Sequence, residues 1–191
     1  MKVCIVSELV GTEREAGREI SSIYLYKELK SKGINIDLIS LENGIKLNLP
    51  KILKIYPNIR DFVYAFFGKK ILKELEKNYD IIHITSTTLS SFYKPQKPLI
   101  ITCHGILSEK FRKVDQNLFY KLIFKAIYPP MYFIEQKALK KADKIIVLKN
   151  ESKEFLNKQF RIDYDKITVI PNGIDTNLFR SQKIKKEYDL I

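Results

Sequence analysis

The two histidines of the chain each lie where a predicted strand ends. His83 falls within the run DIIHIT, and His104 directly follows the run LIITC. Ligands of an open parallel sheet bind beyond the carboxyl ends of its strands, so both imidazoles are candidates for hydrogen bonding a ligand there. Gly105 leaves room for that ligand to approach the backbone. We therefore predict a binding role for His104, whereas for His83 a structural role is an equal alternative.

The loop after the first predicted strand is a second candidate site. It reads ELVGTEREAGREI, in which Gly11 and Gly17 are too far apart for the GxGxxG fingerprint of nicotinamide-binding proteins. A helix that begins near Gly17 would point its first free N–H groups, including that of Arg18, at the loop, and such groups bind phosphate. An ordinary strand-to-helix loop has the same composition, so this signal is weak by itself.

Other kinds of site are disfavoured by residue spacing. Cys4 and Cys103 sit in separate apolar runs, without the CxxC spacing of redox or zinc sites, and we expect two buried thiols in a reducing compartment. Two histidines without a third ligand at a matching spacing make a metal site unlikely. Neither a P-loop nor a GxSxG nucleophile motif occurs. We expect neither a metal nor a resident cofactor.

A strong positive charge indicates anionic partners. Lys and Arg number 34 against 22 acidic residues, for a net charge of +12. Nucleic acid, phosphorylated metabolites and an acidic membrane all fit this charge, as does a solvated Lys-rich surface. Residues 51–77 form a basic amphipathic stretch suited to an anionic membrane or a phosphorylated acceptor. Residues 105–141 are also basic and rich in aromatics, which favours a helix packed in the core over a membrane edge or base stacking.

Alternating strand and helix patterns must position these residues. Short apolar runs alternate with amphipathic stretches, which predicts an α/β fold with a Rossmann-like, doubly wound parallel sheet in one domain. No run is long enough for a membrane span, and the first residues do not form a signal peptide, so we expect a cytoplasmic protein. The predicted strands are 2–7, 34–40, 80–85, 99–103, 144–148 and 167–170; the predicted helices are about 20–33, 58–78, 116–141 with a break at Pro129-Pro130, and 150–160.

The segment VIPNGIDTNLF, residues 169–179, carries dense turn signals. Pro171 should end the last strand, and Asn172-Gly173 should take the positive φ angles of a sharp turn. Asp175 is placed to cap a short helix that reaches Phe179.

Taken in order, these pieces resemble the N-terminal domain of the family 4 retaining glycosyltransferases, which have the GT-B architecture of two facing Rossmann-like domains. The resemblance covers residues 1–180, and residues 181–191 look like the start of a linker to a second domain. It implies that this half binds the acceptor and that a C-terminal domain, absent from the chain, binds the nucleotide-sugar. The matching runs are KVCIVS, AGREISSIYLYKELKSKGINIDLIS, DIIHIT, PLIITCHG, IEQKALKKADKIIVL and ITVIPNGIDTNLF.

The resemblance also implies roles for individual residues. The loop at Ala16-Gly17, followed by Arg18, would approach the donor diphosphate. His104, next to Gly105, would lie beside the transferred sugar and act catalytically, by a hydrogen bond to the sugar or by stabilising charge in the transition state. The family commonly has Gly-Gly where this chain has Ala16-Gly17, so the chain departs from the family pattern at the residue expected to contact the phosphate.

Further positions would line the acceptor site or the cleft between the domains. They are His83, Lys149, Asn172 and Gly173; Lys149 stands where the family usually has Ser, so a hydroxyl contact there does not transfer. Glu135 and Asp143 are expected to tie a helix to the following strand.

Two other classes of function remain open from sequence. A sugar-nucleotide epimerase can share the GT-B architecture, although the IPNGID run favours the transferases. A module that binds nucleic acid or membranes would also fit the charge. We expect the 191-residue chain to be catalytically incomplete by itself.

Overall fold

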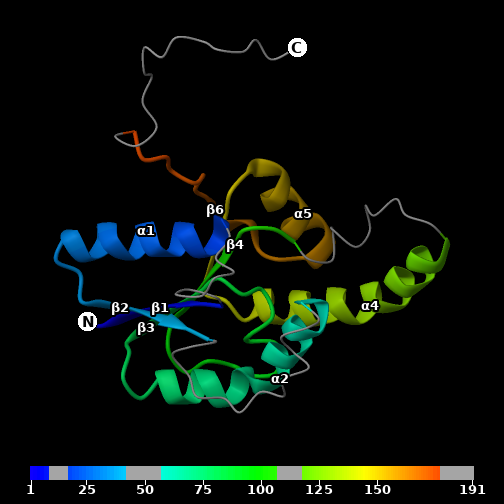
Figure 1. Ribbon diagram of the computed structural model, residues 1–191, viewed down its shortest axis with the longest axis horizontal. Coiled ribbons are helices and arrows are strands. Elements are labelled where there is room, and N and C mark those ends of the chain that lie inside the picture. The colour runs from blue at the N-terminus through cyan, green and yellow to red at the C-terminus, as the bar shows by residue number, and fades with distance from the viewer. Residues whose placement is uncertain (9–16, 42–56, 107–117, 177–191) are drawn as a thin grey trace, which may run out of the picture.

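Six parallel strands form one sheet at the centre of the molecule (Figure 1). The structure, a computed structural model, describes residues 1–8, 17–41, 57–106 and 118–176. The sheet order is β2-β1-β3-β4-β5-β6, which confirms the predicted doubly wound topology. The strands are β1 (Val3–Ser7), β2 (Ile36–Ser40), β3 (Ile81–Ile84), β4 (Leu99–Cys103), β5 (Lys144–Val147) and β6 (Ile167–Val169).

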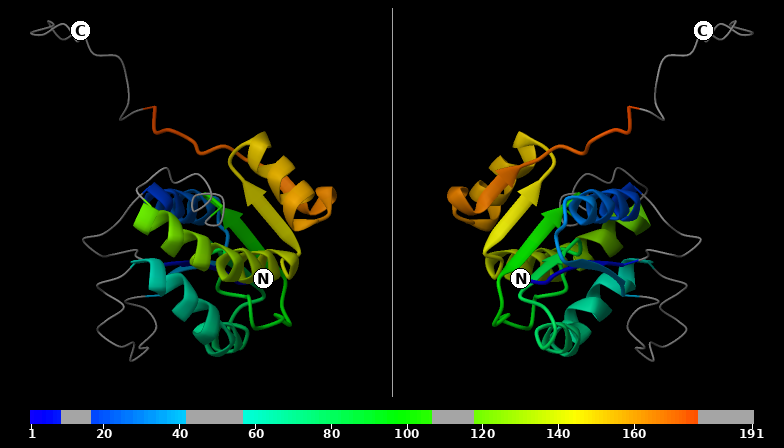
Figure 2. Two further views of the ribbon diagram at one scale, coloured as in Figure 1. Left: turned by 90° about the vertical axis from the view of Figure 1, so that its right-hand side faces the viewer. Right: turned by 90° about the vertical axis from the view of Figure 1, so that its left-hand side faces the viewer.

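Helices cover both faces of this sheet. In Figure 1, α1 lies on one side of the strands, and α2 and α4 lie on the other. Residues of α5 pack against α4, where the rings of Tyr132 and Phe160 meet edge to face with centroids 4.8 Å apart. In the described residues the helices are α1 (Gly17–Ser31), α2 (Pro57–Leu75), α4 (Leu118–Lys140) and α5 (Asn150–Phe160), and a 3-10 turn follows at Tyr164–Lys166. Figure 2 gives two further views of this arrangement.

The strand register assigns side chains to the two faces. Ile5 of β1 lies opposite His83 of β3, and His83 lies opposite Ile100 of β4. Because strand side chains alternate between faces, Ile5, His83 and Thr102 share one face. Their neighbours Cys4, Ile82 and Ile101 point the other way, into the core cluster that includes residues of α2, α4 and α5.

The predicted helix over residues 116–141 is one continuous helix, so the predicted break at Pro129-Pro130 is wrong. Both prolines are exposed, inside α4. A proline inside a helix removes one backbone hydrogen bond, and the carbonyl groups that lose their partners can be satisfied by water when that side of the helix is exposed. The helix therefore continues past the two prolines.

A buried polar loop connects β3 to β4. Its serine and threonine side chains, at positions 85–88, 90 and 91, are all nearly inaccessible to solvent. Ser90 and Ser91 donate to the backbone carbonyls of Ala138 and Ile134 in α4. Lys141 donates in return to the carbonyl of Ser91, at 2.6 Å. These bonds to α4 and Lys141 satisfy buried polar groups that would bond to water in a surface loop.

Glu135 and Asp143, which were expected to have a structural role, each accept a hydrogen bond that joins two parts of the fold. Glu135 is fully buried and accepts a hydrogen bond from Thr87 at 2.9 Å. Asp143 accepts from the backbone N–H of Leu99 at 2.8 Å. Both contacts join α4 or the residues after it to the β3–β4 region, whereas the predicted partner was the strand that follows α4.

The two cysteines are buried as predicted, whereas the aromatic residues of α4 are buried only in part. Cys4 and Cys103 are free and buried, as predicted. Tyr132 packs against the core, but Phe133 is 55% exposed, so the core interpretation of these aromatics holds only in part. Within the described residues, no helix combines the length and apolar character that crossing a bilayer requires.

Candidate functional site at the carboxyl edge of the sheet

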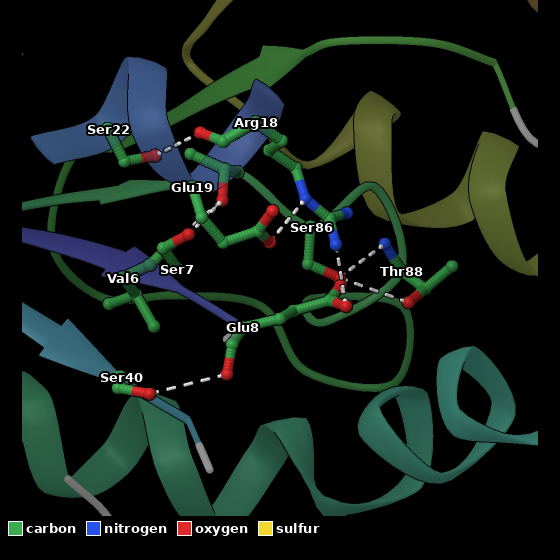
Figure 3. A network of polar contacts seen from close by, with 10 residues as sticks. Val6, Ser7, Glu8, Arg18, Glu19, Ser22, Ser40, Ser86 and Thr88 are labelled. Atoms are coloured by element: carbon green, nitrogen blue, oxygen red, sulfur yellow. Dashed lines mark hydrogen bonds and ion pairs between the residues drawn. The ribbon is translucent and has the colours of Figure 1, made fainter. Parts of the chain in front are cut away.

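An ion-pair network lies where β1 ends and α1 begins (Figure 3). The guanidinium of Arg18 donates from Nη2 to Oε2 of Glu8 at 2.8 Å and from Nε to Oε1 of Glu19 at 3.1 Å. Both carboxylates are 1% exposed, whereas Arg18 is 26% exposed. One partly exposed cation therefore neutralises two carboxylates that folding has removed from water.

Neighbouring hydroxyl groups support this network. Ser40, at the end of β2, donates to the carbonyl of Glu8, and Ser22 donates to the carbonyl of Arg18 at 2.9 Å. Thr85, just after β3, donates to Ser7 and to the carbonyl of Val6. Hydrogen bonds thus join the end of β1 to the ends of β2 and β3. Figure 3 shows the bond from Ser40 to the carbonyl of Glu8.

His104 belongs to the same region. It is half-buried directly after β4, and its pKa falls from 6.5 to about 4. Burial is the main cause; the positive charge of Arg18 lowers the pKa further, and the negative charge of Glu19 opposes this. The imidazole is therefore neutral at pH 7 and carries one N–H donor and one acceptor nitrogen. The structure brings His104 and Arg18, two predicted site residues, close together.

His83 lies deeper, inside the sheet. It is 6% exposed, and its Nε2 lies 2.7 Å from Oγ1 of Thr102. Burial, and secondarily His104, lowers the pKa of His83 to about 4. The ring of His83 is thus neutral, buried and hydrogen bonded to Thr102.

The glycines of the predicted site differ in their surroundings. Gly17 is the first residue of α1, and no atom of the described residues lies within 4 Å of the place where a Cβ would stand. The described part of the chain therefore leaves space beside this residue at the start of the helix. Gly105 is half-buried, and its carbonyl accepts from Sγ of Cys103 at 3.4 Å. Ala16 lies outside the described residues.

The segment after β6 contacts α1. Oδ1 of Asn172 accepts a hydrogen bond from Oγ of Ser21 at 3.2 Å. Neither Asn172 nor Gly173 has a positive φ, so the predicted sharp turn is wrong. The helix predicted after Asp175 falls among residues that lie outside the described part of the chain.

Lys149 precedes α5 at the same edge of the sheet. It is exposed, its backbone is extended, with φ −152°, and its side chain forms no capping bond to α5. Its ammonium group is accessible to an anion, but no contact joins it to the Arg18 network in the described residues.

Sequence analysis missed the two carboxylates of this site. Glu8 is the first residue after β1, a position that the rule for parallel sheets marks for attention. Glu19 sits in the first turn of α1, where a carboxylate interacts favourably with the helix dipole. Both positions follow from these two rules, whereas the glycine spacing and the free N–H groups of the loop indicate only a phosphate site. Among the described residues, no group of three or more acidic, histidine or cysteine side chains could hold a metal ion.

Comparison with known proteins gives consistent matches. The sequence model of Glycosyltransferase Family 4 matches residues 17–178. The UDP-Gal:alpha-D-GlcNAc-diphosphoundecaprenol alpha-1,3-galactosyltransferase of Escherichia coli is 26% identical over 180 residues, which cover 86% of this chain and 43% of the relative. The crystal structure of Anabaena HepE in complex with UDP superposes with a TM-score of 0.50 at 16% identity, covering 96% of this chain and 47% of HepE. A second HepE structure, in complex with UDP-glucose, gives the same TM-score.

The chain thus spans less than half the length of these relatives. The matched residues begin at the first turn of α1 and extend through the segment after β6, so the match includes Arg18, Glu19 and His104 of the candidate site but not Glu8. It favours the transferases over the epimerase alternative.

Proposed function

The chain belongs to glycosyltransferase family 4, and from this premise we propose that it is the N-terminal, acceptor-side part of a retaining glycosyltransferase. The whole enzyme would transfer a sugar from a nucleotide-sugar donor to an acceptor hydroxyl. A second Rossmann-like domain would supply the nucleotide site, and the carboxyl edge of the sheet described above would face it.

One observation carries this proposal. The neutral, half-buried imidazole of His104 lies beside the first turn of α1, where Gly17 leaves open space. A neutral imidazole hydrogen bonds hydroxyl groups, and a free helix N-terminus binds phosphate. A sugar diphosphate contains both groups, next to each other.

The backbone of α1, more than the side chain of Arg18, would hold the donor phosphate. Arg18 is already bonded to Glu8 and Glu19, so a phosphate would compete with two buried carboxylates for its charge. The N–H groups of Gly17 and Arg18 lie at the start of the helix and carry its positive dipole. Lys149, exposed before α5, is a second cation that could meet the diphosphate.

His104 would act on the transferred sugar. As the bond between the anomeric carbon and the phosphate oxygen breaks, positive charge develops on the sugar and negative charge on the leaving phosphate. A hydrogen bond from the imidazole to a sugar hydroxyl would fix the ring during this step. The acceptor oxygen would then attack from the face that the phosphate leaves, and its proton would pass to a phosphate oxygen, which retains the anomeric configuration.

This mechanism assigns cationic and dipolar groups to the diphosphate, and we propose that no metal or resident cofactor takes part. His83 and Thr102 would support His104 from below, and Asn172 and Gly173 would line the cleft between the two domains. Ser21, bonded to Asn172, would hold that segment against α1.

The names of the relatives guide the choice of substrate. The Escherichia coli relative is named for transfer from UDP-Gal to a GlcNAc-diphosphoundecaprenol acceptor, and HepE was solved with UDP and UDP-glucose. We therefore propose a UDP-sugar donor and, first among saccharide and small-molecule alternatives, a lipid-linked acceptor. Such an acceptor would keep the protein at the inner face of the membrane, within reach of cytoplasmic UDP-sugars.

The test is an assay of the longest natural protein that contains these 191 residues. UDP-, GDP- and ADP-sugars would be supplied with a lipid-linked diphosphate sugar acceptor, and the release of nucleoside diphosphate measured with and without that acceptor. The proposal predicts acceptor-dependent release with a UDP-sugar and a product whose anomeric configuration, by NMR, equals that of the donor. An inverted product, or no transfer from any donor, would contradict it.

A further inference from the structure

A cluster of exposed aromatic rings lies on the α2–α4 side of the sheet, away from the α1 site. Phe66 of α2 is 68% exposed, Phe133 of α4 is 55% exposed and Phe92 of the β3–β4 connection is 37% exposed. Lys137 of α4 joins them. We call these four residues the aromatic–lysine surface.

The four side chains form one contiguous group. The rings of Phe66 and Phe92 stack with centroids 5.1 Å apart and planes at 23°. The ammonium of Lys137 lies 5.0 Å from the centroid of Phe92 and 5.6 Å from that of Phe133. Three chain segments therefore place apolar rings around one cation at the surface. Single exposed phenylalanines are normal in soluble proteins, whereas a contiguous cluster of exposed rings indicates an interaction surface.

Further cations surround the rings. Exposed lysines occur on α2 one and two turns after Phe66 and on α4 one turn after Lys137. The nearest acid on α2, Glu74, is bonded to Lys77, and Glu76 accepts bonds from Tyr93 and the Gln96 backbone. The surrounding lysines are Lys69, Lys70, Lys73 and Lys140.

The orientation of the rings decides among anionic partners. Binding of single-stranded nucleic acid uses free ring faces, on which bases stack. Here the face of Phe92 is used by Phe66 and Lys137, and Lys137 also lies over Phe133. The part of the phenylalanine rings that is still exposed to a partner is apolar and is surrounded by lysine ammonium groups. Such a surface suits the boundary of an anionic bilayer, where rings enter the headgroup region and lysines meet lipid phosphates.

We propose that the aromatic–lysine surface docks the protein on an anionic phospholipid bilayer. Rings from two helices and a loop, fixed by mutual contacts, would enter the interface at little cost in conformational entropy. The lysines would supply the attraction to negative headgroups, so binding should weaken with salt. This inference stands independently of the acceptor, since a bilayer surface can be bound whatever sugar the site transfers.

The test is flotation of the 191-residue chain with vesicles. Vesicles of phosphatidylcholine with phosphatidylglycerol would be compared with phosphatidylcholine alone, in about 0.1 M salt and in about 0.5 M salt. The proposal predicts binding to the anionic vesicles at low salt and much weaker binding in the other conditions. No binding to anionic vesicles by folded protein at low salt would overturn it.

Two pairs of variants locate the surface. The double variant Phe66→Ser/Phe133→Ser removes the two most exposed rings, and Lys70→Glu/Lys73→Glu reverses two of the cations. Each should weaken binding by about tenfold or more, since a lysine near an anionic surface contributes about 1 kcal/mol. Circular dichroism would check that all variants fold.

Matched variants on α1 supply the control. Tyr24→Ser/Leu25→Ser removes two exposed apolar side chains there, and Lys27→Glu/Lys32→Glu lowers the net charge of +12 by the same four units as the other charge pair. The proposal predicts binding within about twofold of the wild type for these controls. Equal losses in both sets would show diffuse charge attraction and overturn the proposal. Dimers that dissociate in Phe66→Ser/Phe133→Ser, with unchanged vesicle binding, would assign the surface to a second copy of the chain.

Discussion

Arg18, in the first turn of α1, and Glu8, the first residue after β1, meet at 2.8 Å. The same guanidinium also binds Glu19, so the side chain of Arg18 joins the first turn of α1 to the residue that follows β1. This arrangement orients the helix N-terminus toward the carboxyl edge of the sheet, where His104 lies. The ion pair therefore has a positional role in the site even if it never touches a substrate.

Replacing Arg18 should destabilise the fold. Arg18→Ala leaves Glu8 and Glu19 buried without their shared cation, and the loss of one partner of a buried pair costs about 3–5 kcal/mol. Because Arg18 is 26% exposed and water can partly replace it, we expect the lower end of that range or less. The measurement is the free energy of unfolding in urea. The variant Arg18→Ala/Glu8→Gln should recover part of the loss; strictly additive losses would contradict the coupling.

The two histidines should make the protein less stable in acid. Their pKa values fall from 6.5 to about 4 in the folded state, so between about pH 6.5 and pH 4 the unfolded chain binds more protons than the folded one. Stability from this source is complete above pH 6.5 and is lost as the pH falls toward 4. For the buried His83, the loss can reach about 3 kcal/mol.

The variant His83→Gln tests this assignment, because it removes one of the two titrations and keeps a polar side chain near Thr102. Its free energy of unfolding should fall less steeply between pH 6.5 and pH 4 than that of the wild type. Parallel curves for the two proteins would mean that His83 does not titrate as described.

Gly68 should tolerate no side chain. A Cβ at this position of α2 would lie 1.6 Å from the carbonyl oxygen of Leu89, a backbone atom that cannot rotate away. Gly68→Ala should therefore cost at least about 1–3 kcal/mol and displace the β3–β4 loop. Gly17→Ala is the matched control, since its Cβ meets nothing within 4 Å and should change stability by about 0.5 kcal/mol or less. Similar melting temperatures for the two variants would contradict the close approach.

Thr87 should stabilise the buried loop through Glu135. Thr87→Val keeps the shape of the side chain but removes the donor that lies 2.9 Å from Oε1 of Glu135, at an expected cost of about 1–3 kcal/mol. Thr168→Val makes the same change on β6, at an exposed position, and should be neutral within about 0.5 kcal/mol. Equal unfolding free energies for both variants would show that the buried hydroxyl contributes little.

Periodicity predicted the fold well because the elements are regular. Alternating apolar runs located all six strands within two residues or so of their ends, and β4 and α5 agree with the predicted bounds. Pro129-Pro130 misled the prediction because proline signals a break only when nothing else satisfies the backbone. Asn172 misled it in another way, since its side chain bonds Ser21 across the fold and its backbone makes no tight turn.

Only part of the candidate site could be predicted from the sequence. His104 and the first turn of α1 were predicted because ligands of a parallel sheet bind at the carboxyl ends of its strands. The pairing of Arg18 with Glu8 was not readable, since side-chain contacts between a loop and a helix depend on how the chain packs. The contact of His83 with Thr102 likewise depends on the register of β3 and β4, which sequence spacing does not specify.

The turnover number of His104→Ala tests the central claim most directly. It would be measured with a UDP-sugar and acceptor in the longest natural protein that contains this chain, beside the wild type and Thr168→Val. If His104 contacts the sugar in the transition state, kcat should fall by about 10²–10³-fold while the circular dichroism spectrum and the unfolding midpoint at pH 7 stay near those of the wild type. A kcat within threefold of the wild type would contradict the claim and remove His104 from the catalytic site.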